Sequence, residues 1–143
     1  MASHSSNLWQ RWFDVKELKI NTSSREELKD ITSKVKRSVS DIGLEDGICV
    51  LYVPHTTAGI TINESADPDV ATDIVSQLEE IAPRDKGYRH REGNADAHIK
   101  SSLIGNTTRI FIENGSLQLG TWQGIFFAEF DGPRSRTVWI KTS

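Results

Sequence analysis

Several features are scarce in this 143-residue sequence. Its single cysteine, Cys49, cannot form a disulfide within the chain, and no apolar run approaches the roughly 20 residues that span a membrane. The N-terminus also lacks the apolar segment of a secretory signal peptide. Together these absences predict a cytoplasmic protein that keeps its thiol reduced and has no membrane partner.

A surplus of charge of one sign is missing too, because the formal net charge is only −3. Such a chain offers no general attraction to nucleic acid, so we expect no nucleic-acid partner and only a local anion site. The hydrophobic fraction of 36% and the charged fraction of 26% are typical of one globular domain. We expect that domain over residues 9–143, after a disordered tail over 1–8 that is mostly small and polar.

Hydrophobic spacing predicts both helices and strands, and therefore an α+β domain. A capping sequence at Ser23–Glu27 predicts a first helix that ends at Gly43, and Asp67 caps a second helix that Pro83 stops. A short third helix is expected over 97–103. The strands are expected over 12–20 with a bend near 16–17, then 48–53, 60–62, 108–113, 125–130 and 137–140. The run 48–53 is apolar throughout, which favours a strand covered on both sides, and the last two strands are expected to pair antiparallel.

Three of the four histidines lie where one element gives way to another. His55 follows a buried strand, His90 lies in an irregular segment, and His98 is close to the start of the short helix. Strand ends and loops direct side chains into cavities, so we expect the three imidazoles to share one site. They could bind zinc and activate water. Alternatively, each could be an isolated histidine with its own hydrogen bonds.

Polar groups follow His55 directly. Thr56 and Thr57 precede a glycine and could present hydroxyls and backbone amides to a phosphate, or could form only a turn. Asn63 belongs to an acidic stretch that could hold magnesium beside a pyrophosphate. Asp67 and Asp69 in that stretch are also explained by the start of the second helix.

A second dense segment surrounds His98. Asn94, Asp96, His98 and Lys100 bring an amide, a carboxylate, an imidazole and an ammonium together. Asp96 could orient the ring of His98 or only cap the short helix, and Lys100 could bind phosphate or remain solvated.

Near the C-terminus, Trp122 and Gln123 stand between glycines. The indole could stack on a flat heteroaromatic ring or could belong to the core. Arg134 and Arg136 have the planar guanidinium that suits phosphate, or they are ordinary surface charges.

Three segments, 55–64, 93–100 and 119–124, resemble in order the signature blocks of the YjbQ-like proteins, some of which are named secondary thiamine-phosphate synthases. The resemblance implies a single α+β domain with a mixed, mainly antiparallel sheet, two main helices and a short third helix. It also implies a homotrimer and a histidine-lined pocket. The implied activity, which is weak, joins an aminopyrimidine-methyl diphosphate to a thiazole phosphate and releases diphosphate.

Carried onto this sequence, the resemblance and the residue chemistry define one candidate site. The expected catalytic residues are His55, His90, His98, Asp96 and Asn63. The expected substrate- or phosphate-binding residues are Thr56, Thr57, Asn94, Lys100, Trp122, Gln123, Arg134 and Arg136.

Three functions remain open at this point. The first is transfer chemistry on a small phosphorylated heteroaromatic substrate, assisted by a divalent metal and without an organic cofactor. That metal would be magnesium with the diphosphate or zinc at His55, His90 and His98. The second is a metal-dependent hydrolase of a small phosphorylated compound. The third is a trimeric module that binds a metal or phosphate without turnover.

Overall fold

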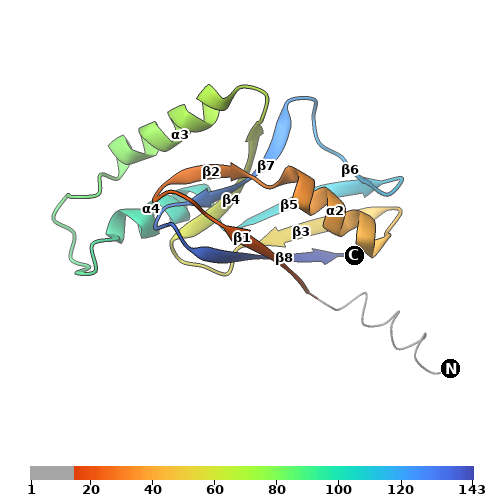
Figure 1. The fold of residues 1–143 in the computed structure, drawn as a ribbon, viewed down its shortest axis with the longest axis horizontal. Coiled ribbons are helices and arrows are strands. Elements are labelled where there is room, and N and C mark those ends of the chain that lie inside the picture. Colours follow the sequence, from red (N-terminus) through yellow and green to blue (C-terminus); the bar gives the residue numbers. More distant parts are fainter. Residues whose placement is uncertain (1–14) are drawn as a thin grey trace.

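The computed structural model describes residues 15–143 (Figure 1). The expected tail over 1–8 and the first residues of the expected strand over 12–20 lie outside this range. The elements follow the order β1 (Lys16–Asn21), β2 (Glu27–Asp30), α2 (Thr32–Ile42), β3 (Gly47–Tyr52), β4 (Ala58–Glu64), α3 (Pro68–Ile81), α4 (Ala95–Ile104), β5 (Thr107–Glu113), β6 (Ser116–Leu117), β7 (Gln123–Glu129) and β8 (Ser135–Thr142).

The strands form two sheets that pack face to face. The larger sheet has the order β1-β8-β3-β5-β6 and the smaller one β2-β7-β4, and all the pairings between neighbours are antiparallel. Apolar side chains from both sheets and from α2 meet in the main core, including those of Ile20, Leu51, Ile110, Ile140, Ile60, Phe127, Val35 and Val39. The α+β class and the three helices, α2, α3 and α4, are therefore confirmed for the described residues.

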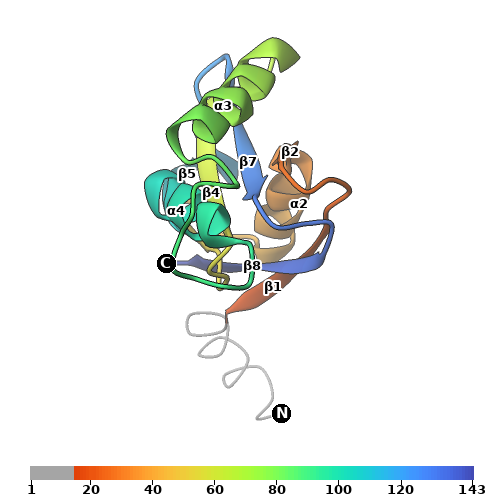
Figure 2. The same ribbon diagram turned by 90° about the vertical axis from the view of Figure 1, so that its left-hand side faces the viewer.

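Helices α3 and α4 cover the outer face of the smaller sheet (Figure 2). Leu78 of α3 and Ala97 of α4 pack there with Ala128 and Phe130, at the end of β7, in a second apolar cluster. Residues 124–130 are all buried, because β7 has a sheet neighbour on each edge and packed side chains on each face.

The outer face of the larger sheet keeps apolar side chains in contact with solvent. Ile48 and Phe111 face each other across β3 and β5, and their side chains are 38% and 67% exposed. The strand expected to be covered on both sides is therefore covered on one: Cys49 and Leu51 point into the core, and Ile48 and Tyr52 point outward. Because inward- and outward-facing positions of this strand are both apolar, the sequence predicted a covering layer on each face of it. Residues 15–143 provide that layer on one face only.

Two expected features of the chain were wrong. The first helix starts at Thr32, not near Ser23, because residues 27–30 pair with β7 as β2. The carboxylate of Glu27 does accept hydrogen bonds from the amides of Ser23 and Ser24, but it closes a turn before a strand. The bend expected near 16–17 is also absent from the pairing, since β1 matches β8 without a break from Lys16 to Asn21.

The expected pairing of the last two strands was wrong as well. β7 has β2 on one edge and β4 on the other, so no edge is left for β8, which crosses to the larger sheet between β1 and β3. By contrast, the second helix begins where its cap predicts, because the Asp67 carboxylate accepts from the amide of Asp69 at 2.9 Å. Among the described helices, none is long and apolar enough to cross a membrane.

Candidate functional site

His55 lies between β3 and β4, and the main chain of β8 fixes its ring. The backbone N–H of Thr137 donates to His55 Nε2 at 3.0 Å. Burial lowers the pKa of this imidazole, and the positive charge of Arg136 lowers it further. A neutral ring that accepts at Nε2 carries its proton on Nδ1. His55 therefore offers a hydrogen-bond donor to any ligand beside it.

Two open hollows meet at this histidine, and both are lined by His55, Thr56 and Asn106. The first, which we call the histidine hollow, has a volume of about 540 Å³ and also contains His98, Ser101 and Ser102. The second, the aromatic hollow, also measures about 540 Å³ and contains Tyr52, Thr57, Arg136 and Trp139. Each has the size of a small-molecule site.

An aromatic pair forms one wall of the aromatic hollow. The rings of Tyr52 and Trp139 stack with their centroids 5.6 Å apart and their planes 24° apart. Sequence reasoning missed both residues, although the alternation of Val138 and Ile140 as core positions already assigned Trp139 to the outer face. A planar ring bound here would find a flat apolar surface beside hydrogen-bonding groups.

His90 and His98 meet edge to face, with ring centroids 5.3 Å apart. His98 lines the histidine hollow together with His55, and the ring of His90 packs against the ring of His98. His90 Nε2 also lies 3.6 Å from Glu92 Oε2. The structure thus brings the three histidines of the candidate site into one region, with His98 between the other two.

Arg136 is paired before any ligand reaches it. Its guanidinium donates to both carboxylate oxygens of Glu129, from Nε at 2.8 Å and from the second terminal nitrogen, which also donates to Thr57 Oγ1 at 2.9 Å. Burial would raise the pKa of Glu129, but the hydrogen bonds from Arg136 and Thr22 outweigh it and lower that pKa. The other terminal nitrogen of the guanidinium remains available to a ligand in the aromatic hollow, which Arg136 lines.

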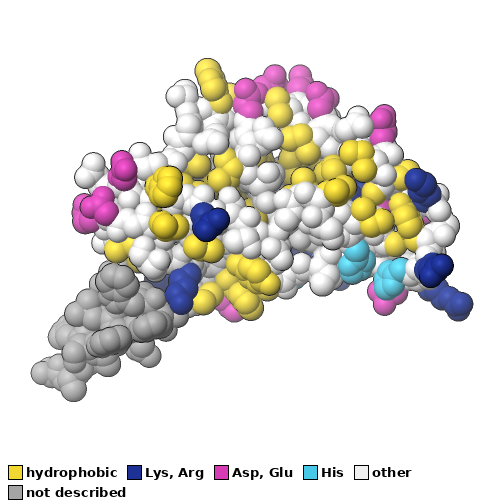
Figure 3. All heavy atoms as spheres, turned by 180° about the vertical axis from the view of Figure 1, so that it is seen from behind, with side chains coloured by type: hydrophobic (Ala, Val, Ile, Leu, Met, Phe, Trp, Pro, Cys, Tyr) yellow, Lys and Arg dark blue, Asp and Glu magenta, His cyan; other side chains and the backbone are white. Residues whose placement is uncertain are grey.

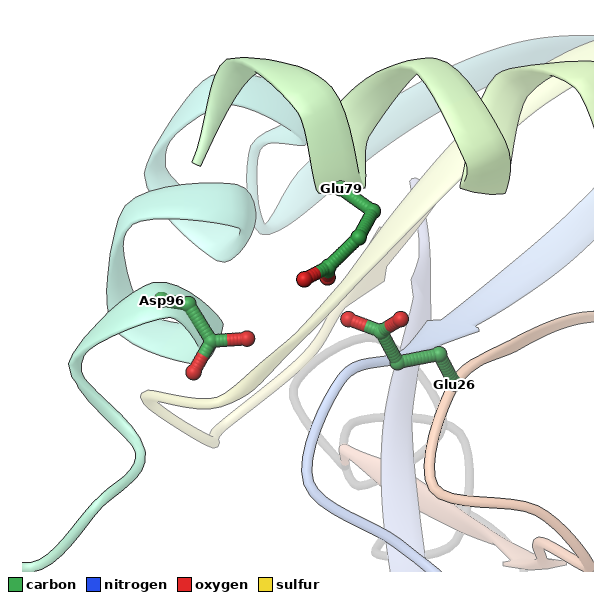
Figure 4. A group of neighbouring side chains, drawn as sticks. All are labelled: Glu26, Glu79 and Asp96. Atoms are coloured by element: carbon green, nitrogen blue, oxygen red, sulfur yellow. The ribbon is translucent and has the colours of Figure 1, made fainter. Parts of the chain in front are cut away.

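Lys100 is buried in a cage of carboxylates. Glu26, Glu79 and Asp96 point toward one another from three different segments (Figure 4), and Lys100 Nζ donates to all three, at 2.5 Å to Glu79 and 3.0 Å to Asp96. Burial alone would lower the pKa of Lys100, but these three bonds raise it. Arg25 adds a second cation to Asp96, at 3.1 Å. We call these five residues the lysine clasp; within it Lys100 and Asp96 bind one another and not a ligand.

Asn94 and Arg134 converge on one carboxylate. Asn94 Nδ2 donates to Asp131 Oδ2 at 2.9 Å, and Arg134 donates to the same oxygen at 3.1 Å. The other amide atom of Asn94, Oδ1, is buried without a hydrogen-bond partner among the described residues. The Asn94 side chain therefore joins the start of α4 to the β7–β8 connection, and the Arg134–Asp131 contact lies within that connection.

Three predicted site residues lie at the far end of the smaller sheet. Asn63 is opposite Gly124 in the β4–β7 pairing, five positions from Ala58, which corresponds to roughly 17 Å along a strand. Trp122 is 63% exposed there, and Gln123 Oε1 accepts from the amide of Gly120. Within one chain, the structure separates these residues from the histidines.

The donor geometry bears on the expected metal. In residues 15–143, the group of acidic or histidine ligands with atoms within 4.8 Å of one another is Glu26, Glu79 and Asp96, and the Lys100 ammonium already occupies the position of a cation among them. His55 would have to release the Thr137 amide before its Nε2 could ligate. Among the described residues the three histidines do not form such a group, so this geometry does not support zinc held by one chain, and zinc at the three histidines stays a prediction.

Comparison with known proteins decides the family. A family model described as "UPF0047 protein YjbQ-like" matches residues 16–143. The chain belongs to this family. UPF0047 protein MJ1081 of Methanocaldococcus jannaschii is 57% identical to this YjbQ-like chain over 122 residues, which cover 85% of the chain and 88% of that protein. UPF0047 protein YugU of Bacillus subtilis is 51% identical, over 89% of this chain and 97% of its own length.

A solved structure of a YjbQ/UPF0047 family protein from Clostridium acetobutylicum has the same fold as this YjbQ-like chain. It superposes with a TM-score of 0.87 at 53% sequence identity and covers 90% of this chain and 99% of that chain. The family resemblance read from the three sequence blocks is thereby confirmed.

Proposed function

We propose that this protein binds a small phosphorylated heteroaromatic compound around His55 and acts as a transferase of the thiamine-phosphate-synthase type. The observation that carries the proposal is the meeting of two hollows at His55, one with imidazoles and hydroxyls and the other with an aromatic wall. A planar ring would pack against Tyr52 and Trp139. Its phosphate groups would face hydrogen-bond donors.

In the proposed reaction the bond between the methylene carbon of the pyrimidine and its diphosphate oxygen breaks, and the thiazole nitrogen forms a new bond to that carbon. The diphosphate leaves with the bonding electrons, so negative charge grows on its oxygens. Donors held in place beforehand stabilise such charge without reorganising. The neutral His55 is such a donor, because Thr137 fixes its ring with Nδ1–H free.

One observation favours a second candidate, a hydrolase. His98 contacts His90, which has Glu92 close by, so a carboxylate and two imidazoles lie in sequence beside the histidine hollow. Such a series can hold a general base in place for the activation of water.

The test is to incubate the protein with the aminopyrimidine-methyl diphosphate and the thiazole phosphate and to measure thiamine phosphate and released diphosphate. We expect product with the native chain and none with His98→Ala, whose thermal stability should stay close to native. The substitution His4→Ala near the N-terminus is the matched control and should retain activity. Absence of product at high enzyme concentration would rule out the transferase activity. Phosphate released from the pyrimidine compound alone would support the hydrolase activity. A large loss of stability in His98→Ala with activity retained would assign that histidine to packing.

We also propose that the chain acts as a homotrimer. Support comes from the outer face of the larger sheet, where Ile48 and Phe111 are solvent-exposed in the single chain. Exposed apolar side chains that gather on one face are typical of a protein interface.

A further inference from the structure

The connection between α3 and α4 concentrates positive charge. Residues 84–91, which we call the cationic loop, contain Arg84, Lys86, Arg89 and Arg91 and a single carboxylate, Asp85. None of these four cations forms an ion pair with another residue of the described range 15–143. This contrasts with a chain whose net charge is −3.

The cationic loop is held in place at several points. Tyr88 Oη donates to the carbonyl of Pro83 at 2.6 Å, and the amide of Arg84 donates to Glu79 Oε1 at 2.9 Å. Gly87 has a φ of 69°, a left-handed conformation that glycine adopts readily, and it turns the chain between these contacts. The arginine side chains are thus presented from an ordered backbone.

A hollow of about 290 Å³ opens within this loop, and the charged and imidazole side chains of its lining are those of Arg84, Asp85, Lys86, His90 and Arg91. His90 forms its boundary toward the rest of the site, because its ring contacts His98, which lines the histidine hollow. The two hollows therefore lie on either side of the His90–His98 pair. Figure 3 shows histidine side chains beside those of lysine and arginine at this end of the molecule.

We propose that the cationic loop binds the far end of the diphosphate, beyond the end that reacts beside His55. The inference rests on the proposed function, since it assigns a position to the leaving group of that reaction. The guanidinium groups of Arg134 and Arg136 are neutralised by Asp131 and Glu129, whereas the cations of the loop are free of such partners. A diphosphate carries more negative charge and more acceptor oxygens than a monophosphate, so several unpaired cations in one hollow select it.

The experiment is calorimetric titration of the full chain with inorganic diphosphate and, separately, with inorganic phosphate at low ionic strength. Diphosphate should bind at least about tenfold more tightly than phosphate, the difference expected from one additional charge-assisted contact. The double variant Arg84→Gln/Arg91→Gln should weaken diphosphate binding about tenfold or more. Lys34→Gln/Arg37→Gln on the exposed face of α2 removes the same charge and should leave the binding unchanged.

Equal affinity for diphosphate in the two double variants, or no diphosphate binding by the native chain, would overturn the inference. So would tight binding of a single-stranded oligonucleotide that the loop variant alone loses, which would assign the loop to nucleic acid. If diphosphate binding depends on the loop but no thiamine phosphate forms, the anion site is supported and the transferase activity is ruled out. If the loop variant makes product with native kcat and KM, the anion site is ruled out and the transferase activity is supported.

Discussion

The guanidinium of Arg136 illustrates what a fold does to a residue with obvious binding chemistry. From its neighbours in the sequence it is a candidate phosphate ligand, yet its side chain is almost wholly buried against Glu129. Glu129 holds Arg136, Thr22 and the amides of Phe130 and Asp131, so it ties the end of β7 to the start of β8. Breaking one partner of a buried ion pair leaves the other charge uncompensated.

We expect Glu129→Gln to lower the free energy of unfolding by about 3–5 kcal/mol at neutral pH, measured by chemical denaturation. The hydrogen bonds from Arg136 and Thr22 lower the pKa of Glu129, so its contribution is complete above the ordinary value of 4.5 and is lost as the pH falls through the lowered one. The stabilities of native protein and variant should therefore converge in acid.

Glu113→Gln is the matched control, because Glu113 lies exposed on β5. It should change the unfolding free energy by less than about 0.5 kcal/mol. A loss of the same size in both variants, or no convergence below pH 4.5, would contradict the role given to Glu129.

The elements divide into those whose causes are local and those whose causes are distant. Helix α3 was predictable because its cap, its first-turn proline and its apolar stripe all lie within residues 67–81. β2 was not predictable, because residues 27–30 become a strand only by pairing with β7, about a hundred positions away. A helical spacing that begins at Leu28 cannot reveal that partner, and the pairing overrides the local preference.

The site divides in the same way. His55 and Thr56 could be chosen from the sequence because they lie between β3 and β4, and His98 because it lies in the first turn of α4. Tyr52 and Trp139 required the β3–β8 register, which places them opposite each other. The separation of Asn63 from the histidines likewise follows from the direction of β4.

The lysine clasp joins three segments, so its loss should loosen α4. We expect Lys100→Met, which keeps the length but removes the charge, to lower the unfolding free energy by about 3 kcal/mol, since three carboxylates then face one another. Hydrogen exchange of the α4 amides should accelerate more than that of the β3 amides.

Lys34→Met, at an exposed position on α2, is the control and should show neither effect. Native stability and native α4 exchange in Lys100→Met would mean that the carboxylates relax without their central cation, and the clasp would then have no structural role.

Residues 15–143 form three layers, and the larger sheet is one of the two outer layers. The smaller sheet lies between the larger sheet and the pair α3 and α4, so the apolar side chains of the larger sheet point inward on one face and to solvent on the other (Figures 1 and 2). This face contains the most exposed large hydrophobic side chain of the described residues, that of Phe111.

If this face joins the copies of a homotrimer, Phe111→Glu should yield a monomer in light scattering coupled to size-exclusion chromatography, because a carboxylate would have to be desolvated at each contact. Trp122→Glu changes another exposed aromatic residue, at the end of the smaller sheet, and should remain trimeric. A trimer in both variants would place the interface elsewhere. A monomeric native protein would contradict the proposed homotrimer.

The bond between the amide of Thr137 and the ring of His55 has a consequence for mutagenesis. Its donor belongs to the peptide backbone, so an alanine scan across β8 would leave it intact and register position 137 as silent. Only a change that deletes the N–H itself, such as proline or a backbone ester, would free the imidazole to exchange tautomers. A side-chain map of this enzyme candidate would therefore omit one of the atoms that sets its chemistry.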